Sequence, residues 1–316
     1  MSALRRALPV LVLAGLFALQ FVLGDYDHTN MARILVLACF AVGYNIAFGM
    51  TGLLSLGHAM FFAAGLYGAG FAAELGGLAP PVALAAGTAC GLVLALAVGL
   101  VALRTSGVAF MIVTLMFAQA CFLTILHFNE LTRGDEGFVI AETARRFAVA
   151  GMAFDAADPA FRYNAALAIF ALAYGAYLVL ARSTIGRVLV GIRENEERVR
   201  MLGYDPYRYR LVALTLSGAL AGLAGAAYAL LFAYVGATFA TTQYSIYPLL
   251  CVLLGGAGTA LGPLVGTGIM FVLVDRLSGI TSSYLLLVGL ALILLVVLFP
   301  KGILGTLGQR LARGRP

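Results

Sequence analysis

The chain has 316 residues, of which 62% are hydrophobic and only 11% are charged, and its formal net charge is +6. A soluble domain carries about 25% charged residues, so this composition excludes a soluble globular protein and indicates an integral membrane protein. Four cysteines, Cys39, Cys90, Cys121 and Cys251, lie inside apolar runs without any CxxC pair. Their spacing argues against a disulfide framework and against a metal site.

Ten apolar runs are predicted to be membrane-spanning helices, which need about 20 residues each. They cover residues 7–24, 33–50, 56–75, 80–103, 107–127, 163–181, 209–234, 244–260, 262–280 and 282–299. The first run follows Arg5 and Arg6 as in a signal peptide, but no small-x-small cleavage pattern comes after it, so we interpret it as a membrane helix. The sequence therefore predicts an all-α membrane protein with about ten transmembrane helices in a single polytopic domain over residues 1–316.

The basic residues divide unequally between the two sides of the predicted membrane. Two at the N-terminus, Arg104, seven in residues 182–210 and four near the C-terminus lie on one side, against six on the other. The acidic residues divide the opposite way, four against ten. Because loops rich in arginine and lysine remain in the cytoplasm, we expect both termini and residues 182–210 to be cytoplasmic. Residues 128–162 then form an outer loop.

The predicted topology is compatible with an inverted repeat. Spans two to five begin outside and spans seven to ten begin inside, and paired units of opposite orientation are typical of such repeats in transporters. Two glycine-rich stretches, residues 49–58 and 255–263, interrupt the apolar pattern, but both fall on the cytoplasmic side. They do not correspond to each other under the repeat, so the topology suggests it without support from the sequence.

The glycine-rich stretches are candidates for functional breaks. Irregular backbone at membrane depth is tolerated only where it is buried in protein or lines a cavity. For residues 255–263 we favour an ordinary tight turn at Pro263, whereas polar neighbours of residues 49–58 favour a buried functional element. The substrate-pathway candidates are the polar residues in or next to this stretch and two residues of the fifth span. They are Asn45, Thr51, Ser55, His58, Thr114 and Gln119. Hydrogen bonding between helices explains each of them singly as well, and Thr114 and Gln119 lie about 140° apart around a helix.

Residues 182–210 are the most polar part of the chain, with seven arginines and four acids. Their middle predicts a short amphipathic helix, in which Asn195 suits the N-cap and Gly203 the position after the last turn. A short helix between membrane spans is typical of a docking surface, and a solvated loop is an equally supported interpretation. If the helix docks, its apolar residues are expected to make the buried contact; these are Val199, Met201 and Leu202.

Several kinds of chemistry have no residues to support them. All fourteen acids lie in loops or at span edges, whereas a proton-coupled carrier usually needs an intramembrane carboxylate or a histidine relay. The only lysine is Lys301, and there is no P-loop motif. We therefore expect no catalytic residue, metal, cofactor or ATP site in this chain, and we expect a partner to supply the energy.

Several motifs occur together between about residues 34 and 305. They are residues 52–59 (GLLSLGHA), 113–115 (VTL) with Gln119, 183–187 (STIGR), 192–196 (IRENE), 202–204 (LGY), 217–225 (SGALAGLAG), 254–259 (LGGAGT) with Gly262-Pro263, and 299–302 (FPKG). The set resembles the permease subunits of branched-chain amino-acid ABC importers, and the LSLGHA form is similar to their M-type subunit. One departure is Arg133-Gly134, where relatives tend to have a Gly-Gly pair.

The resemblance implies a permease subunit of an ATP-driven importer of branched-chain, hydrophobic amino acids in the bacterial cytoplasmic (inner) membrane. It implies a heterodimer with a second permease subunit, two ATP-binding cassette subunits that hold ATP and Mg, and an extracytoplasmic substrate-binding protein, with membrane lipid but no nucleic acid as further partners. The alternative is a secondary carrier or channel for small polar solutes such as urea or short amides. The ATPase-coupling candidates that the resemblance implies are Arg193, Glu194, Asn195, Glu196, Glu197, Arg198, Val199, Met201, Leu202 and Gly203.

Overall fold

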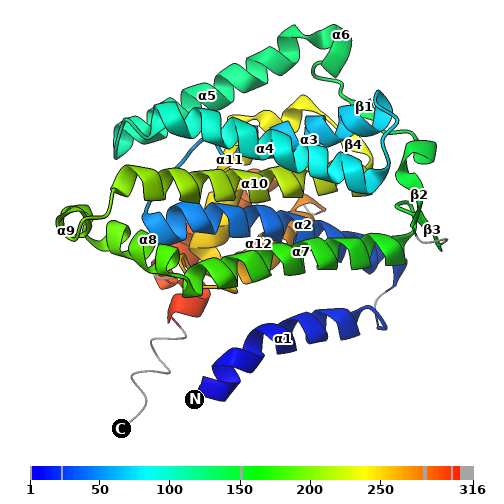
Figure 1. The fold of residues 1–316 in the computed structure, drawn as a ribbon. Coiled ribbons are helices and arrows are strands. Elements are labelled where there is room, and N and C mark those ends of the chain that lie inside the picture. Colours follow the sequence, from blue (N-terminus) through cyan, green and yellow to red (C-terminus); the bar gives the residue numbers. More distant parts are fainter. Residues whose placement is uncertain (1, 23, 150–151, 280–282, 300–301, 307–316) are drawn as a thin grey trace.

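The structure is a computed structural model that describes residues 2–22, 24–149, 152–279, 283–299 and 302–306. These residues form mainly α-helices that run side by side in a bundle (Figure 1). Ten of the helices overlap the ten predicted apolar runs: α1 (Ser2–Leu19), α2 (Asp25–Asn45), α3 (Ala59–Glu74), α4 (Pro80–Ala102), α5 (Val108–His127), α7 (Pro159–Arg182), α10 (Pro206–Phe232), α11 (Thr242–Gly255), α12 (Gly262–Ser278) and α13 (Tyr284–Leu298).

Among the described residues, five helices are long and apolar enough to cross a membrane. They are α4, α5, α7, α10, and α2 together with the π-helical turn η1 (Ile46–Met50) that continues it. Shorter apolar stretches occur in α1, α11 and α13. The prediction of an all-α membrane protein is confirmed, whereas the exact number of crossings stays a prediction.

The centre of the bundle is the antiparallel pair α2 and α10 (Figure 1). The most apolar window of α2 is 78% buried and that of α10 is 67% buried, against only 17% for α5. A helix that is apolar on every face and buried on most of them belongs to the core. The exposed apolar face of α5 therefore meets lipid or another subunit.

Glycines allow α3, α4 and α10 to pack with their backbones in contact. A Cβ atom at Gly65 would lie 2.0 Å from the carbonyl oxygen of Gly222, and one at Gly91 would lie 2.6 Å from the Gly222 Cα. In lipid, helices associate through such close van der Waals packing because apolar side chains gain little from leaving the lipid tails. The high glycine content of the chain is used in part at this contact.

The packing partners agree with the predicted repeat of the second to fifth and seventh to tenth spans. Helix α10 packs on α3 and α4, and in the same way α2 packs on α11 and α12; α3 packs on α4 as α11 packs on α12. The break after α2, residues 51–58, corresponds to residues 233–241 after α10, and residues 75–79 correspond to residues 256–261. Each glycine-rich break therefore has an irregular counterpart of different sequence.

The outer segment contains short strands besides the expected short helices. Helix α6 (Asn129–Thr132) leads to strand β1 (Phe138–Val139), which pairs with β4 (Tyr234–Val235) and so ties the segment to the end of α10. A 3₁₀ turn, η2 (Glu142–Arg145), precedes the hairpin of β2 (Arg146–Val149) and β3 (Met152–Asp155). A second 3₁₀ turn, η3 (Ala237–Ala240), precedes α11.

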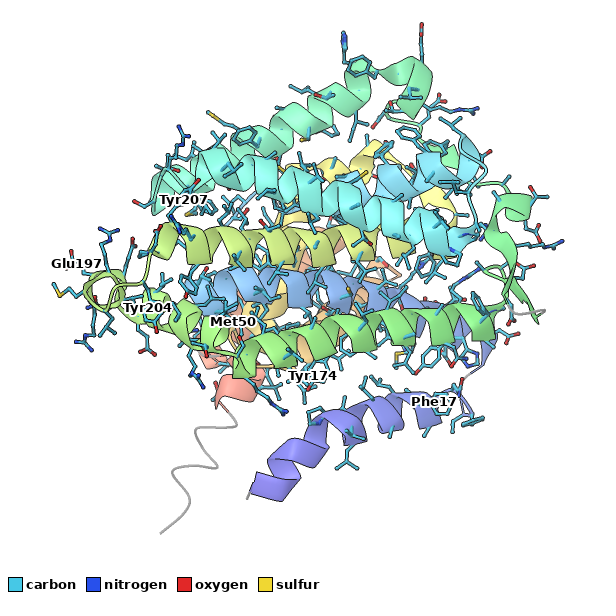
Figure 2. All side chains as sticks on the ribbon, viewed as in Figure 1. Phe17, Met50, Tyr174, Glu197, Tyr204 and Tyr207 are labelled. Atoms are coloured by element: carbon cyan, nitrogen blue, oxygen red, sulfur yellow. The ribbon has the colours of Figure 1, made fainter. Side chains whose placement is uncertain are left out.

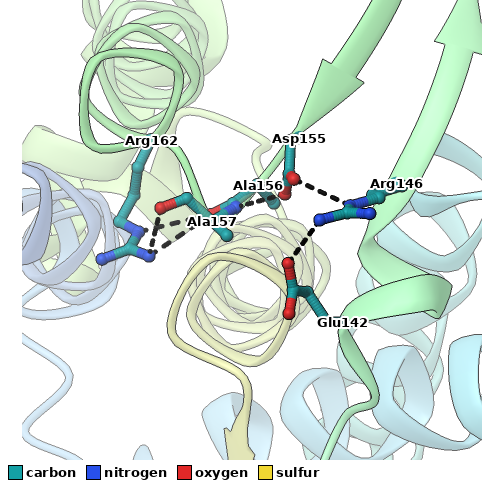
Figure 3. Close-up of polar contacts among 6 residues, drawn as sticks. All are labelled: Glu142, Arg146, Asp155, Ala156, Ala157 and Arg162. Carbon is teal, nitrogen blue, oxygen red and sulfur yellow. Dashed lines mark hydrogen bonds and ion pairs between the residues drawn. The ribbon is translucent and has the colours of Figure 1, made fainter.

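A charge network closes the β2–β3 hairpin (Figure 3). The Arg146 guanidinium lies 2.6 Å from the Glu142 carboxylate and 2.9 Å from that of Asp155. The Ala157 backbone N–H and the Arg146 guanidinium, both hydrogen-bonded to the Asp155 carboxylate, hold its pKa below the ordinary value. Beside it, Arg162 donates to the carbonyl oxygens of Ala156 and Ala157.

The predicted cytoplasmic segments lie at the opposite end of the bundle. Two helices, α8 (Thr184–Glu194) and α9 (Glu196–Met201), are at the same end as the start of α1 and the helical turn at residues 302–306 (Figure 1). The outer strands β2 and β3 are at the other end (Figure 1). The loops rich in basic residues and the loops poor in them thus lie at opposite ends of the bundle. Which end faces the cytoplasm stays a prediction.

Candidate functional site

The first glycine-rich break begins where α2 changes its helical type. Helix α2 continues as the π-helical turn η1, and such turns are frequent at functional sites. The Thr51 hydroxyl donates to the Ala47 carbonyl oxygen and accepts from the Leu53 backbone N–H at 3.2 Å. Gly52 then reverses the chain with φ +75°, a conformation that favours glycine. Thr51 therefore shapes the turn with its side chain.

A buried amide joins the first break to the second. The Asn45 side chain is fully buried, and its Nδ2 donates to the Thr259 carbonyl oxygen at 3.0 Å. Its Oδ1 accepts from the Gly258 backbone N–H at 2.9 Å. A Cβ atom at Gly49 would lie 2.0 Å from the Asn45 Oδ1, so the amide needs a glycine one turn away. The two breaks, more than two hundred residues apart, are thus held together.

Two further side chains converge on the same backbone. The Tyr177 hydroxyl of α7 donates to the Gly258 carbonyl oxygen at 3.1 Å. The Arg193 guanidinium of α8 donates to the Gly49 carbonyl oxygen, and its Nη1 also lies beside Gly258. We call this set, Asn45, Gly49, Tyr177, Arg193 and Gly258, the break junction. It connects α2, α7, α8 and both breaks.

A second polar cluster surrounds His58 at the start of α3. The imidazole is fully buried and its Nε2 lies 2.7 Å from the Ser217 Oγ of α10. Because the Ser217 hydroxyl donates its only proton to the Gly43 carbonyl oxygen, His58 Nε2 is assigned as the donor and Nδ1 as the unprotonated nitrogen. Nδ1 has no hydrogen-bond partner among the described residues. Beside it, the Tyr44 hydroxyl donates to the Ser55 carbonyl oxygen at 3.0 Å.

The two candidates on α5 are placed differently. Thr114 is buried, and its hydroxyl accepts from the Leu56 backbone N–H at 3.3 Å and donates to the Met111 carbonyl oxygen at 3.0 Å. It therefore joins the first break. Gln119 lies on the exposed side of α5, because five positions rotate it about 140° away from Thr114. The structure brings Asn45, Thr51, Ser55, His58 and Thr114 to one end of α2 and leaves Gln119 apart.

The short helix of the charged segment has the predicted caps. The Asn195 side chain accepts from the Arg198 backbone N–H at 2.9 Å, and Gly203 has φ +87° after the last turn of α9. Glu196 pairs with Arg200 at 3.0 Å and with Arg210 at 2.7 Å. These contacts confirm the predicted helix and tie its beginning to the start of α10.

The apolar residues of α9 and of its C-cap position, Leu202, divide between the inside and the surface. Val199 is 7% exposed and packs on Val188 and Ile192 of α8, so it fixes α9 to α8. Met201 and Leu202 are 86% and 70% exposed. Only these last two are available to a partner in this conformation. Figure 2 shows Glu197 at the tip of α9, beyond the bundle, and Met50 of η1 at the same end.

The comparison with known families decides the protein family of this apolar bundle with its two polar breaks. A model of the branched-chain amino acid transport system permease component matches residues 29–298, most of the chain. The chain belongs to this permease family. It is a multi-pass membrane protein, as its apolar helices require.

The permease is similar to curated proteins of the same description. It is 28% identical to the high-affinity branched-chain amino acid transport system permease proteins LivM of Escherichia coli K12 and of Salmonella typhimurium LT2, over 93% of this chain and 73% of each relative. It is 33% identical to the probable branched-chain amino acid transport permease protein LivM of Methanocaldococcus jannaschii, over 30% of this chain and 29% of that relative. No solved structure matches the permease. The family resemblance predicted from the motifs is confirmed.

Sequence reasoning missed several residues of the permease that the site uses. Helix α8 was not predicted, although Ser183 is a good N-cap and Val188, Leu189 and Ile192 have helical spacing; its Ser183 hydroxyl accepts from the Gly186 N–H at 3.1 Å. Residues 255–263 are not a simple turn, because Asn45 binds their backbone. Ser217 and Tyr177 lie in otherwise apolar helices, and nothing in the sequence pairs them with their partners.

We predict that Ser55→Ala/His58→Ala lowers substrate uptake by the assembled transporter about tenfold, because it removes the unpaired Nδ1 acceptor from the first break. The control is Ser217→Ala, which breaks the same hydrogen bond but keeps the imidazole. Ser217→Ala should lose about 1–3 kcal/mol of stability because it leaves buried groups unsatisfied, and the double variant should lose more because the buried imidazole leaves a cavity. Only the double variant should lose most of its uptake. Uptake and thermal unfolding are measured on the same preparations, and normal uptake by the double variant would remove these residues from the pathway.

Proposed function

We propose that the permease is one of two permease subunits of an ATP-driven importer of branched-chain amino acids, and that the two subunits together form the translocation pathway. The observation that carries this proposal is the family match over residues 29–298, with relatives described as high-affinity branched-chain amino acid permeases. Two cassette subunits bind and hydrolyse ATP with Mg, and a binding protein delivers the amino acid from outside. The permease lies in the cytoplasmic membrane with both termini and α8–α9 inside.

The proposed route of coupling runs through contacts of described residues. A cassette subunit docks on the exposed Met201 at the end of α9 and on Leu202, its C-cap residue. Val199 packs α9 on Val188 and Ile192 of α8, so the two short helices move as a unit. Arg193 of α8 binds the Gly49 carbonyl oxygen in the first break. A displacement of α9 by the cassette is then transmitted to the break junction.

The proposed pathway borders the first break, where the chain is both buried and polar. Most of the polar groups there already have partners inside the chain, which stabilises the resting arrangement. His58 Nδ1 is the exception among the described residues around this break. A zwitterionic amino acid needs transient polar partners to cross an apolar bundle, because an unpaired polar group is costly away from water. An acceptor at this position meets part of that need.

The proposed function is tested by reconstitution with the second permease subunit, the cassette subunits and the binding protein in liposomes. Uptake of leucine, isoleucine or valine should require ATP, Mg and the binding protein, because the chain has no P-loop of its own. Uptake that proceeds without nucleotide would instead support a secondary carrier or channel, and uptake of urea or acetamide in preference to leucine would reassign the substrate.

The docking part of the proposal predicts that Leu202→Asp uncouples the transporter more severely than Arg200→Ala. A buried apolar anchor within an interface contributes more than an exposed charge, which is worth about 0–1 kcal/mol. The measurements are co-purification of the cassette subunits and substrate-stimulated ATP hydrolysis. Leu78→Asp provides a control for an exposed apolar residue elsewhere, since Leu78 is 43% exposed in the loop between α3 and α4, outside the predicted spans. Normal assembly and coupling of Leu202→Asp would move the docking surface away from α9.

A further inference from the structure

Two adjoining cavities open at the end of the bundle opposite to α9. The first, of about 430 Å³, lies between the end of α3, α6 and the β1–β4 ribbon. The second, of about 280 Å³, runs between α3, α4 and α5. Phe71 and Leu131 line both cavities, so the second continues the first. We call the first cavity the mouth and the second the groove. The mouth is within the range of small-molecule sites, about 300–1,000 Å³, and the groove is just below it.

The mouth is lined by charges of both signs. Glu74, Glu130, Arg133 and Glu136 surround it. Glu74 accepts a hydrogen bond from the Ala141 backbone N–H at 2.9 Å. Among the described residues, the Arg133 guanidinium and the carboxylates of Glu130 and Glu136 have no ion pair and no hydrogen bond from their side chains. The mouth therefore offers both a cationic and an anionic partner to a ligand.

Arg133 is held in place by its own loop. Its backbone has φ +55°, an uncommon conformation for a residue other than glycine. The buried Thr132 hydroxyl beside it donates to the Ile125 carbonyl oxygen at 2.6 Å and accepts from the Gly134 N–H at 3.1 Å. The corner between α5 and α6 is thereby fixed, and with it the backbone from which the Arg133 side chain reaches the mouth.

The groove is almost entirely apolar, with one polar group that lacks a partner. Its walls include Met60, Ala64 and Ile125. Tyr67 is buried there, with 6% of its surface exposed, and its hydroxyl has no hydrogen-bond partner among the described residues. Its ring lies 5.7 Å from that of Phe71, so it is next to the mouth. A buried hydroxyl without a partner is costly, which points to a ligand or a water molecule at the border of mouth and groove.

We propose that mouth and groove form an outer binding site for a zwitterionic amino acid with an apolar side chain, a proposal that rests on the proposed function. The Arg133 guanidinium binds the α-carboxylate, and Glu130 and Glu136 bind the α-ammonium. The apolar side chain passes Phe71 and Leu131 into the groove. The Tyr67 hydroxyl donates to the carboxylate at the border. The site receives the amino acid before it enters the central pathway near His58.

Charge and shape select this ligand over others. A fatty acid or phospholipid tail fits the groove, but its anionic head meets three carboxylates and one arginine at the mouth. A cationic ligand leaves Arg133 without a partner. Only a ligand that carries both charges next to an apolar group satisfies the mouth and the groove together. Each charged contact is a charge-assisted hydrogen bond, about twice as strong as a neutral one.

The first experiment measures ligand protection in the assembled transporter without nucleotide. Leu131→Cys is introduced with Cys90→Ser and Cys121→Ser, and the rate of modification by an impermeant maleimide is followed. Leucine at four times its dissociation constant should slow the modification about fivefold. Leucinol, which lacks the carboxylate, and 4-methylpentanoate, which lacks the ammonium, should give no protection. The control is Thr143→Cys in the same background, at an exposed position of η2 outside both cavities.

The second experiment separates the charge of Arg133 from its backbone. Arg133→Gln keeps a side chain at the φ +55° position but removes the charge, and should raise KM for leucine about tenfold, which is about 1.4 kcal/mol. Arg133→Lys should recover part of the loss. Arg146→Gln, a charge change in the same outer segment but outside the mouth, should leave KM unchanged. In the groove, Ala64→Leu should reduce uptake of leucine more than that of alanine, whereas the exposed Ala85→Leu on α4 should not change selectivity.

The outcomes distinguish this site from the proposed function. Absence of ATP-driven uptake in the parent protein contradicts the proposed function, and protection of Leu131→Cys by leucine still supports the site. Normal uptake without protection, or an unchanged KM in Arg133→Gln, overturns the site alone. Protection only by the liganded binding protein, and not by free leucine, also overturns it and makes the mouth a contact surface for that protein. Equal protection by leucine and 4-methylpentanoate overturns the zwitterion assignment.

Discussion

The hydrogen bonds of one buried amide hold the two glycine-rich breaks of this permease together. Asn45 both donates to and accepts from the backbone of the second break, at Thr259 and Gly258. Those two backbone groups lie outside regular helix, and their shared partner, the Asn45 side chain, is fully buried. Removing the amide therefore breaks two hydrogen bonds between the breaks at once, each worth about 0.5–1.5 kcal/mol. Glycine at position 49 leaves the space that the amide occupies. The position of both breaks, and of the helices that follow them, depends on this contact.

The break junction also connects the charged segment, residues 182–210, to the membrane bundle. Arg193 is part of a helix that α9 packs against through Val199, and its guanidinium reaches the backbone of the first break. In the proposed coupling route, movement at the docking surface and rearrangement of the breaks share one mechanical connection. At the opposite end, the β1–β4 ribbon joins the outer segment to the end of α10. Helix α10 thus runs from the end with α9 to the end with the outer cavities, along α2.

Local features of this chain were predictable from its sequence, and long-range ones were not. The apolar runs, the Asn195 cap and the Gly203 stop are local, and the structure has them at the predicted places. Helix α8 was also predictable locally, from Ser183 and the spacing of its apolar residues, but the many charges around it obscured this pattern. The contact of Asn45 with Gly258 spans 213 positions, and that of His58 with Ser217 spans 159. No local pattern indicates such pairs. Gln119 was grouped with Thr114 by polarity alone, and helical rotation separates them.

The central claim is that Asn45 and Arg193 act on the same junction, and a double-mutant cycle on ATP-driven leucine uptake tests it most directly. Uptake kcat/KM is measured for Asn45→Ala, Arg193→Ala and the double variant. The control cycle uses Arg104→Ala, at an exposed residue outside the junction, alone and combined with Asn45→Ala. The account predicts a coupling of about 0.5–3 kcal/mol between Asn45 and Arg193, as found for residues that share partners, and additivity within about 0.5 kcal/mol for the control pair. Additive losses from Asn45→Ala and Arg193→Ala would contradict it.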